Sequence, residues 1–248
     1  MSMSETIANG KNMTAVAVNG SPRKDWNTAT LLRHALEGAK SKGARTKLIH
    51  LYDLDYKGCR SCFSCKRKGN TCGGLCAVHD GLRDALQEAL GSDVLLLGSP
   101  IYFDDVTGEM RSFLERLLFP NISYDEFGVS TFSRRVSCGF IFTMNCPEEN
   151  MELVHYDVLF ERHVRVLEIL KGETEILTSH ETWQFADYSA VNAAMFDVAA
   201  NARRREEQFP VDCRKAFEMG SRLVEGRALS RSTAGSPGRS APRHRPGA

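Results

Sequence analysis

Residues 14–28 run Thr-Ala-Val-Ala-Val-Asn-Gly-Ser-Pro-Arg-Lys-Asp-Trp-Asn-Thr and join an apolar stretch to a polar loop. The apolar part, Thr14–Val18, has the length and continuous hydrophobicity of a buried β-strand. Asn19-Gly20 marks a sharp exit from that strand, and Thr28–Lys42 carries leucines and alanines at helical spacing. A strand, a polar turn and a helix in this order predict an α/β protein with a parallel sheet.

The same alternation continues along the chain. Four more strands are predicted at Lys47–Leu51, Asp93–Gly98, Val136–Thr143 and Thr174–Thr178, and four more helical stretches at Leu82–Leu90, Val106–Leu118, Glu148–Leu170 and, interrupted at Phe209-Pro210, Val191–Glu225. Five strands, each followed by a helix, predict a doubly wound five-stranded parallel sheet in a three-layer α/β/α arrangement. Ligands of such sheets bind beyond the carboxyl ends of the strands. The loops after the first, third and fourth strands are therefore the candidate binding loops.

Composition limits the class of protein. Of 248 residues, 42% are hydrophobic and 25% are charged, as in an ordinary globular domain. The longest apolar runs, such as Val94–Leu97, are far shorter than a membrane span requires. No secretory signal is visible at the start of the chain. We therefore expect a cytoplasmic protein without a membrane partner.

The charge is unevenly distributed. The net charge is +1, but residues 229–248 hold four arginines and no acid, so the rest of the chain carries −3. A mildly acidic body argues against nucleic acid as a partner. The last residues are rich in Ser, Pro, Gly and Arg, a composition typical of disorder. We predict one domain over residues 1–228 and a disordered basic tail over residues 229–248.

A cysteine-rich loop, residues 59–76, follows the second predicted strand. It begins Cys59-Arg-Ser-Cys62-Phe-Ser-Cys65 and continues to Cys72 and Cys76. Thiolates at i, i+3 and i+6 can surround one inorganic core and a fourth sulfur can close the cage, which is the spacing logic of iron–sulfur ligation. A zinc or metal-free thiol loop and a redox disulfide are the alternatives. Cys138 and Cys213 fall inside predicted elements, where we expect packed thiols.

The first candidate loop offers donors for a phosphate group. Ser21, Asn27 and Thr28 supply short polar side chains, Arg23 supplies a fork of donors, and the following helix start adds partial positive charge. The loop is neither a P-loop nor a dinucleotide fingerprint, because GxxxxGK[ST] and GxGxxG are absent. The alternative is a capped helix start, in which Thr28 only satisfies backbone donors.

The other two loops offer groups for a flat ring. The loop after the third strand contains Pro100-Ile-Tyr-Phe103 and then Thr107-Gly108. Its aromatic and aliphatic side chains can pack on a ring, although Tyr102 and Phe103 filling the core is the alternative. The loop after the fourth strand supplies Thr143-Met-Asn145, whose polar groups can approach ring carbonyls or nitrogens.

Together these segments resemble the iron–sulfur flavoprotein branch of the NAD(P)H-dependent FMN reductase-like family, within the flavodoxin-like fold. The matching stretches are GSPR…NT at Gly20–Thr28, the cysteine loop at Cys59–Cys76, GSPIYF…VTG at Gly98–Gly108, RSFLERLLFP at Arg111–Pro120, TMN at Thr143–Asn145 and DYS at Asp187–Ser189. The resemblance implies a flavodoxin-like fold, FMN as a cofactor and a [4Fe-4S] cluster on the cysteine loop.

The resemblance also implies which residues hold these groups. The FMN phosphate would lie on Ser21, Arg23, Asn27 and Thr28, and the isoalloxazine ring against Pro100, Ile101, Tyr102, Phe103, Thr107, Gly108, Thr143, Met144 and Asn145. The cluster ligands would be Cys59, Cys62, Cys65 and Cys76. Cys76 stands shortly before Asp80 and is for that reason preferred to Cys72. Trp26 replaces a usual glycine of the phosphate loop, which matters if that position needs a positive φ.

The implied function is an FMN-dependent oxidoreductase or electron-transfer flavoprotein. FMN would carry the chemistry, so no catalytic side chain is expected. With a cluster, ferredoxin or NAD(P)H would donate electrons for a small acceptor. Without one, the chain would be an NAD(P)H-dependent FMN or quinone reductase. From other classes, the alternatives are a non-enzymatic thiol or metal redox sensor and a zinc-stabilised binding module.

Relatives in this branch oligomerise, so we expect a homodimer or a tetramer. The predicted helices at Glu148–Leu170 and Val191–Glu225 exceed what one five-stranded sheet needs for cover. Their apolar residues would bury the interface; they include Leu153, Val158, Leu159, Phe160, Phe196 and Phe217.

Overall fold

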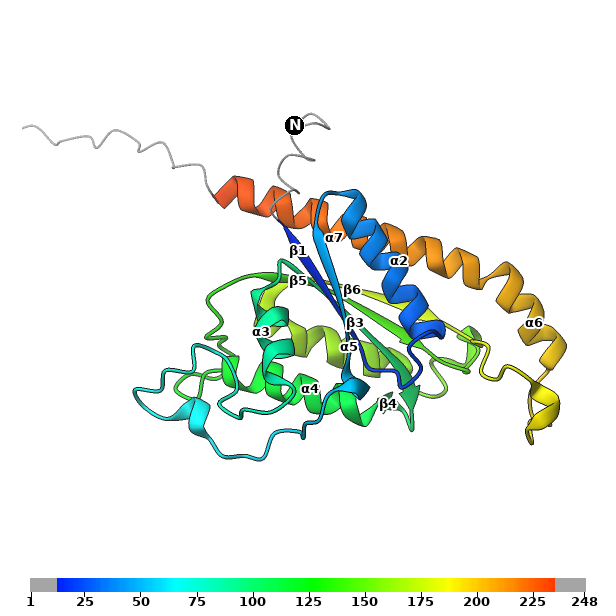
Figure 1. The fold of residues 1–248 in the computed structure, drawn as a ribbon, viewed down its shortest axis with the longest axis horizontal. Coiled ribbons are helices and arrows are strands. Elements are labelled where there is room, and N and C mark those ends of the chain that lie inside the picture. Colours follow the sequence, from blue (N-terminus) through cyan, green and yellow to red (C-terminus); the bar gives the residue numbers. More distant parts are fainter. Residues whose placement is uncertain (1–12, 235–248) are drawn as a thin grey trace, which may run out of the picture.

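Five parallel strands form the centre of the computed structural model, which describes residues 13–234 (Figure 1). They are β1 (Thr14–Asn19), β2 (Arg45–His50), β3 (Val94–Tyr102), β5 (Val136–Thr143) and β6 (Lys171–Ser179). The order across the sheet is β2-β1-β3-β5-β6, with every neighbouring pair parallel. This is the flavodoxin-like order, and the predicted fold class is confirmed. A further short strand, β4 (Asp105–Val106), pairs antiparallel with the end of β3.

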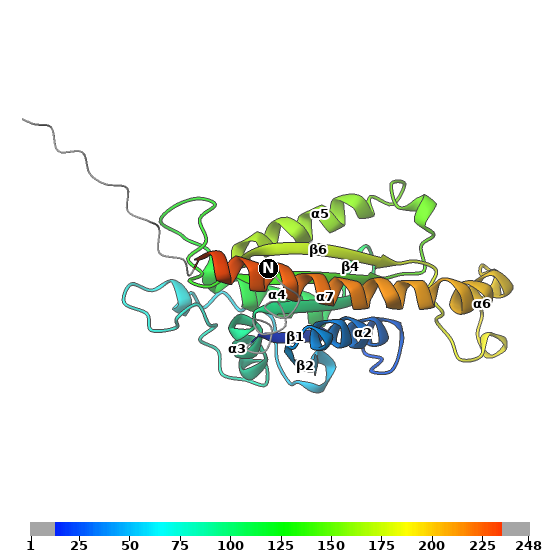
Figure 2. The same cartoon turned by 90° about the horizontal axis from the view of Figure 1, so that it is seen from above.

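Helices cover both faces of the sheet (Figures 1 and 2). On one face lie α2 (Asn27–Ser41) and α7 (Phe209–Ala234), with α6 (Val198–Glu207) leading into α7; on the other lie α3 (Arg83–Gly91), α4 (Gly108–Leu118) and α5 (Tyr156–Leu167). In β1, Ala15 and Ala17 pack under α2 and α7, whereas Val16 and Val18 face the other three helices. Successive strand residues point to opposite faces, so one strand serves two cores.

Short 3₁₀ turns complete the connections. They are η1 (Leu51–Asp53), η2 (Ser64–Lys66), η3 (Phe119–Asn121), η4 (Glu148–Asn150), η5 (Glu168–Leu170) and η6 (Tyr188–Ala190). Only η2 interrupts the irregular chain between Leu54 and the start of α3. Within residues 13–234, no helix has both the length and the apolar character needed to cross a bilayer.

Two glycines bring α2 and α7 into backbone contact. A Cβ on Gly38 would lie 1.9 Å from the carbonyl oxygen of Phe217, and one on Gly220 would lie 1.8 Å from that of Ala35. No larger side chain fits at either position without moving one helix. This close approach fixes α2 against the C-terminal helix and, with it, the loop that enters α2.

Some predicted boundaries are wrong, and the helical stretch expected from Val191 starts only at Val198. The helix expected over Glu148–Leu170 starts only at Tyr156, because His155 has a φ of 57° and ends the preceding turn. Leu159 and Phe160, expected at an interface, are buried in the core. The expected tail starts too early, since α7 continues to Ala234. The rest of that predicted tail, residues 235–248, lies outside the described residues.

Candidate functional site

A cleft of 260 Å³ opens at the carboxyl edge of the sheet, beyond β1, β3 and β5. This edge includes the switch point between β1 and β3, from which the chain crosses in opposite directions. All three predicted loops contribute to the cleft, together with a fourth segment after β6. The lining residues are Ser21, Arg23, Trp26, Asn27, Thr28, Pro100, Ile101, Tyr102, Thr143, Met144, Asn145, Thr182, Gln184 and Phe185.

The loop between β1 and α2 is held by its own polar groups. The Ser21 N–H donates to Asn19 Oδ1 over 3.1 Å, and the Arg23 N–H donates to Ser21 Oγ over 3.2 Å. Trp26 has an extended backbone, with φ −115° and ψ −170°, so this position needs no glycine. The tryptophan is therefore compatible with the loop conformation.

No side chain among the described residues caps the start of α2. The Thr28 hydroxyl pairs with the Thr143 hydroxyl over 2.8 Å instead of capping the helix, so the capped-helix alternative is wrong. The first N–H groups of a helix lack intrahelical partners and carry partial positive charge. This end of the cleft is therefore suited to an anion.

Three predicted site residues lie outside the cleft lining. Thr107 is buried; its hydroxyl donates to the Gly20 carbonyl over 2.7 Å and accepts from the Met110 N–H over 3.3 Å. It caps α4 and ties that helix to the first loop. Gly108 is the first residue of α4. The third residue, Phe103, occupies the tip of a hairpin.

That hairpin joins β3 to β4 through a two-residue turn. Phe103 and Asp104 both have positive φ, 49° and 60°, as a type I′ turn requires. Phe103 is 103% exposed and Tyr102 is 48% exposed. The alternative in which these two aromatic residues fill the core is therefore wrong.

A segment after β6, residues 180–191, was missed as part of the site. Its backbone carbonyls accept from the predicted phosphate loop: Trp183 from Trp26 Nε1 over 2.7 Å and Asn27 Nδ2 over 2.8 Å, and Gln184 from the Arg23 guanidinium. The Gln184 N–H donates to the Tyr188 hydroxyl over 3.2 Å. The DYS stretch, which contains Tyr188, was the only sequence signal for this segment.

The cysteine-rich loop lies at the other end of the molecule. In both views residues 59–76, in cyan, lie far from residues 180–197, in yellow (Figures 1 and 2). The loop packs against the C-terminal end of α4, whose first residue adjoins the cleft. At about 1.5 Å per residue, the 11 residues of α4 form a helix roughly 16 Å long.

The four predicted cluster ligands share one small cavity. Cys59, Cys62, Cys65 and Cys76 line a hollow of about 20 Å³ against Glu115, Arg116, Phe119 and Pro120, whereas Cys72 does not line it. All are free thiols. Within residues 13–234, no three Cys, His, Asp or Glu side chains are gathered tightly enough to hold one metal ion as they stand. Four cysteines that line one cavity supply the donor set of a Cys-ligated cluster, and the loop would draw inward around it.

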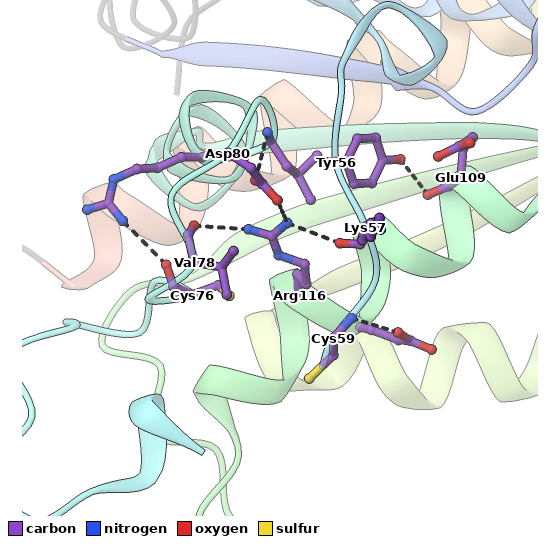
Figure 3. A network of polar contacts seen from close by, with 11 residues as sticks. Tyr56, Lys57, Cys59, Cys76, Val78, Asp80, Glu109 and Arg116 are labelled. Carbon is purple, nitrogen blue, oxygen red and sulfur yellow. Dashed lines mark hydrogen bonds and ion pairs between the residues drawn. The ribbon is translucent and has the colours of Figure 1, made fainter. Parts of the chain in front are cut away.

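A buried arginine on α4 joins the two ends of this loop (Figure 3). Arg116 donates to the Lys57 carbonyl over 3.1 Å, to the Val78 carbonyl over 3.1 Å and to Asp80 Oδ2 over 2.6 Å. Burial alone would raise the pKa of Asp80, but the bonds from Arg116 and the Leu82 N–H hold that pKa below its usual value. The neighbouring Glu115 accepts from the Cys59 N–H over 3.1 Å.

The thiols differ in their environments. Hydrogen bonds from Ser64, through its backbone and then its side chain, lower the pKa of Cys62, whereas burial raises that of Cys65. Burial raises the pKa of Cys138 to about 12. Cys138 and Cys213 are buried in the two cores, which confirms both as packed thiols.

Two larger hollows contain none of the predicted FMN residues. One, of 540 Å³, lies beside the amino ends of β1 and β2, away from the carboxyl edge. The other, of 490 Å³, lies between α4 and α5 and is bordered by Cys59 of the cysteine-rich loop. Most of the predicted FMN residues thus line the smallest of these three hollows.

Residues 13–129 match the family model of NADPH-dependent FMN reductase. This part of the chain is similar to that family. An iron–sulfur flavoprotein of Methanocaldococcus jannaschii is 32% identical over 104 residues, which cover 42% of this chain and 51% of the relative. Another, of Archaeoglobus fulgidus, is 34% identical over 104 residues, covering 42% and 48%. The resemblance to the iron–sulfur flavoprotein branch is confirmed.

The chain spans about half the length of these curated relatives. Among solved structures, an NAD(P)H:quinone oxidoreductase from Methanothermobacter marburgensis superposes with a TM-score of 0.62 at 13% identity, covering 85% of this chain and 98% of that chain. An FMN-dependent NADH-azoreductase from Bacillus anthracis, in complex with FMN, gives 0.57 at 12% identity, covering 86% and 99%. These two similarities support the fold.

Proposed function

We propose that this chain is an FMN-dependent oxidoreductase or electron-transfer flavoprotein. The observation that carries the proposal is the cleft at the carboxyl edge, where the uncapped start of α2 faces the same hollow as Pro100, Tyr102 and Asn145. One end suits a phosphate and the other suits a flat ring. Bound FMN would supply transfer of one or two electrons.

The residues of the chain would bind and orient the cofactor. Ser21, Arg23, Asn27 and Thr28 would hold the phosphate beside the N–H groups of α2. Arg23 and Asn27 now donate to the carbonyls of Gln184 and Trp183, so the phosphate would take over donors that the segment 180–191 occupies. The ring would lie against Pro100–Tyr102 and Thr143–Asn145, and Thr182, Gln184 and Phe185 would shield it from water.

We further propose that Cys59, Cys62, Cys65 and Cys76 hold a [4Fe-4S] cluster. Ferredoxin or NAD(P)H would be the electron donor and a small molecule the acceptor. Since the cysteine loop and the cleft lie at opposite ends of α4, a homodimer or tetramer would bring the loop of one subunit toward the cleft of another. The exposed Leu153 and Val158 are available for such an interface.

A second candidate is an NAD(P)H-dependent FMN or quinone reductase without a cluster. The exposure of Cys59 and Cys62 to solvent favours it. The cleft would then act alone, and the loop would be a thiol or zinc element. A redox sensor would show flavin or cluster absorption but no turnover with any donor.

The absorption spectrum of protein purified without oxygen tests these proposals together. Flavin bands with a broad bleachable shoulder, about four irons per chain and acid-labile sulfide would support the flavoprotein with a cluster. Flavin bands reduced by NAD(P)H, with no iron, would support the second candidate. Protein that contains no flavin and binds none on addition of FMN would contradict the proposed function.

A further inference from the structure

We propose that Arg116 is the positioning residue of the cysteine-rich loop and that its guanidinium gives an N–H to the sulfur of Cys76, which raises the reduction potential of the cluster. The inference rests on the cluster of the proposed function. It assigns a role to the RSFLERLLFP stretch, which contains Arg116 but contributes nothing to the cleft.

The positive charge of Arg116 is buried. Arg116 is 1% exposed, and a buried guanidinium is costly unless it is paired and hydrogen-bonded. Asp80 is its carboxylate partner, at 2.6 Å. A Leu or Met at this position of α4 would fill the core without that cost. The charge therefore calls for a reason beyond packing.

The hydrogen-bond partners of Arg116 flank the cysteine-rich loop in the sequence. Lys57 stands two residues before Cys59, and Val78 stands two residues after Cys76. One guanidinium thus joins both ends of the loop, and the first and last predicted ligands lie just inside the junction (Figure 3). Holding the ends together removes much of the entropic cost of gathering thiols that lie far apart along the chain.

Arg116 also has an N–H group that is available to a further acceptor. Arg116 Nε is buried and finds no hydrogen-bond partner in the part of the chain that the structure describes, and a buried donor without an acceptor is destabilising. The same side chain lines the cavity that the four cysteines also line. Burial lowers the pKa of Arg116, but Asp80 and then Cys76, which lies beside the guanidinium, raise it overall. Because Cys76 lines the same cavity, we infer that its sulfur is the acceptor.

The chemical consequence follows from charge. Reduction adds one electron to a cluster that is already anionic with its four thiolates. A positive charge and an N–H donor beside a ligating sulfur stabilise the reduced form more than the oxidised form. The potential therefore rises. Cys72 lacks this support: it lies off the cavity, where its N–H donates to Asn70 Oδ1 over 3.1 Å.

The experiment compares anaerobically purified full-length parent, Arg116→Gln, Asp80→Asn and Arg111→Gln. Arg111 is an exposed arginine on the same helix and serves as the matched control. Iron and acid-labile sulfide are measured first, and flavin content reports whether each variant keeps its fold. The midpoint potential of the cluster is then measured by redox titration followed by electron paramagnetic resonance.

We expect Arg116→Gln to shift the reduction equilibrium of the cluster about tenfold toward the oxidised form, about 59 mV downward for one electron. Asp80→Asn should shift the potential upward, because it removes the carboxylate that offsets the guanidinium. Arg111→Gln should match the parent. If Arg116→Gln fails to fold and loses flavin as well, the upward shift in Asp80→Asn still tests the charge.

Three results would overturn the inference. Unchanged potentials in both Arg116→Gln and Asp80→Asn would make Arg116 a purely structural residue. A downward shift in Asp80→Asn would contradict the sign. A parent with flavin but without iron and sulfide would remove the cluster and the inference with it, while leaving the flavin site of the proposed function standing.

Discussion

The cleft and the cysteine-rich loop are built in different ways. The cleft lies at the ends of parallel strands, and its walls are joined by contacts such as the 2.8 Å hydroxyl pair of Thr28 and Thr143. The cysteine loop contains one 3₁₀ turn, η2, and two non-glycine residues in the left-handed region, Ser61 and Phe63. Two of its cysteines, Cys59 and Cys62, are exposed.

The difference shows which site depends on its ligand. The sheet holds the cleft residues together before any cofactor binds, because strand register fixes where the loops emerge. The loop is held instead by scattered side chains from other elements, among them Arg116 and Asn121, whose Nδ2 donates to the Gly74 carbonyl over 2.9 Å. We therefore expect the cleft to persist without its ligand and the cysteine positions to depend on a metal.

The largest expected effect separates the two regions outright. Cys76→Ala should lose essentially all iron, because it removes one of four ligands, and should keep the flavin content of the parent. Cys72→Ala is the matched control and should keep both. Iron, sulfide and flavin measured on one anaerobic preparation of each variant decide this. If only Cys72→Ala loses its iron, the fourth ligand is Cys72 and not Cys76.

In the cleft, Arg23→Ala should weaken FMN binding about tenfold to a hundredfold, the range for losing a charge-assisted hydrogen bond. Lys24→Ala is the control, since Lys24 lies next to it but pairs with Asp53 at 2.5 Å. Fluorescence titration of the apoprotein gives both dissociation constants. Equal losses in the two variants would mean that only general charge matters.

A smaller effect is expected from the hydroxyl pair that joins the first and third loops. Thr28→Val should weaken FMN binding about fivefold, because one hydrogen bond is worth about 1 kcal/mol. Thr28→Ser keeps the hydroxyl and should restore most of the affinity. If Ser and Val variants bind FMN equally, the Thr28–Thr143 contact does not shape the site.

The sequence predicted the cleft better than its surroundings. Strand ends follow from apolar runs such as Val136–Thr143, whose predicted bounds match β5, and parallel strands bring their following loops together. Residues 180–191 were missed because their hydrogen bonds to the first loop are made by backbone carbonyls, which any residue type supplies. The exposure of Phe103 was missed because an aromatic residue at a strand end gives no sign of a two-residue turn.

The cysteine loop was predicted by spacing, but its support was not. The side chain of Arg116 meets the loop from about 40 to 60 residues further along the chain, and no local pattern predicts such a contact. The late start of α5 has a similar cause. It depends on one left-handed residue, His155, within a sequence of ordinary helix formers.

The smallest expected effect is the response of the Asp80 anchor of the cysteine-rich loop to acid. The pKa of Asp80 lies below its ordinary value of 3.8. Its contribution to stability is therefore complete above pH 3.8 and is lost as the pH falls through the lower folded-state value. Pepsin should cut the apoprotein within residues 59–76 faster at pH 2.5 than at pH 4. The Asp80→Asn variant should be cut at similar rates at pH 2.5 and pH 4. If the rate of cleavage of the parent does not depend on pH in this way, Asp80 does not anchor the loop.

The central claim is that FMN lies in the cleft with its phosphate at the start of α2. The most direct measurement compares the affinities of the apoprotein for FMN and for riboflavin, which differ only in that phosphate. We predict that FMN binds at least about tenfold more tightly, since charge-assisted hydrogen bonds are worth about 1.5–3 kcal/mol, and that Arg23→Ala reduces the preference. Equal affinities for the two flavins would contradict the account.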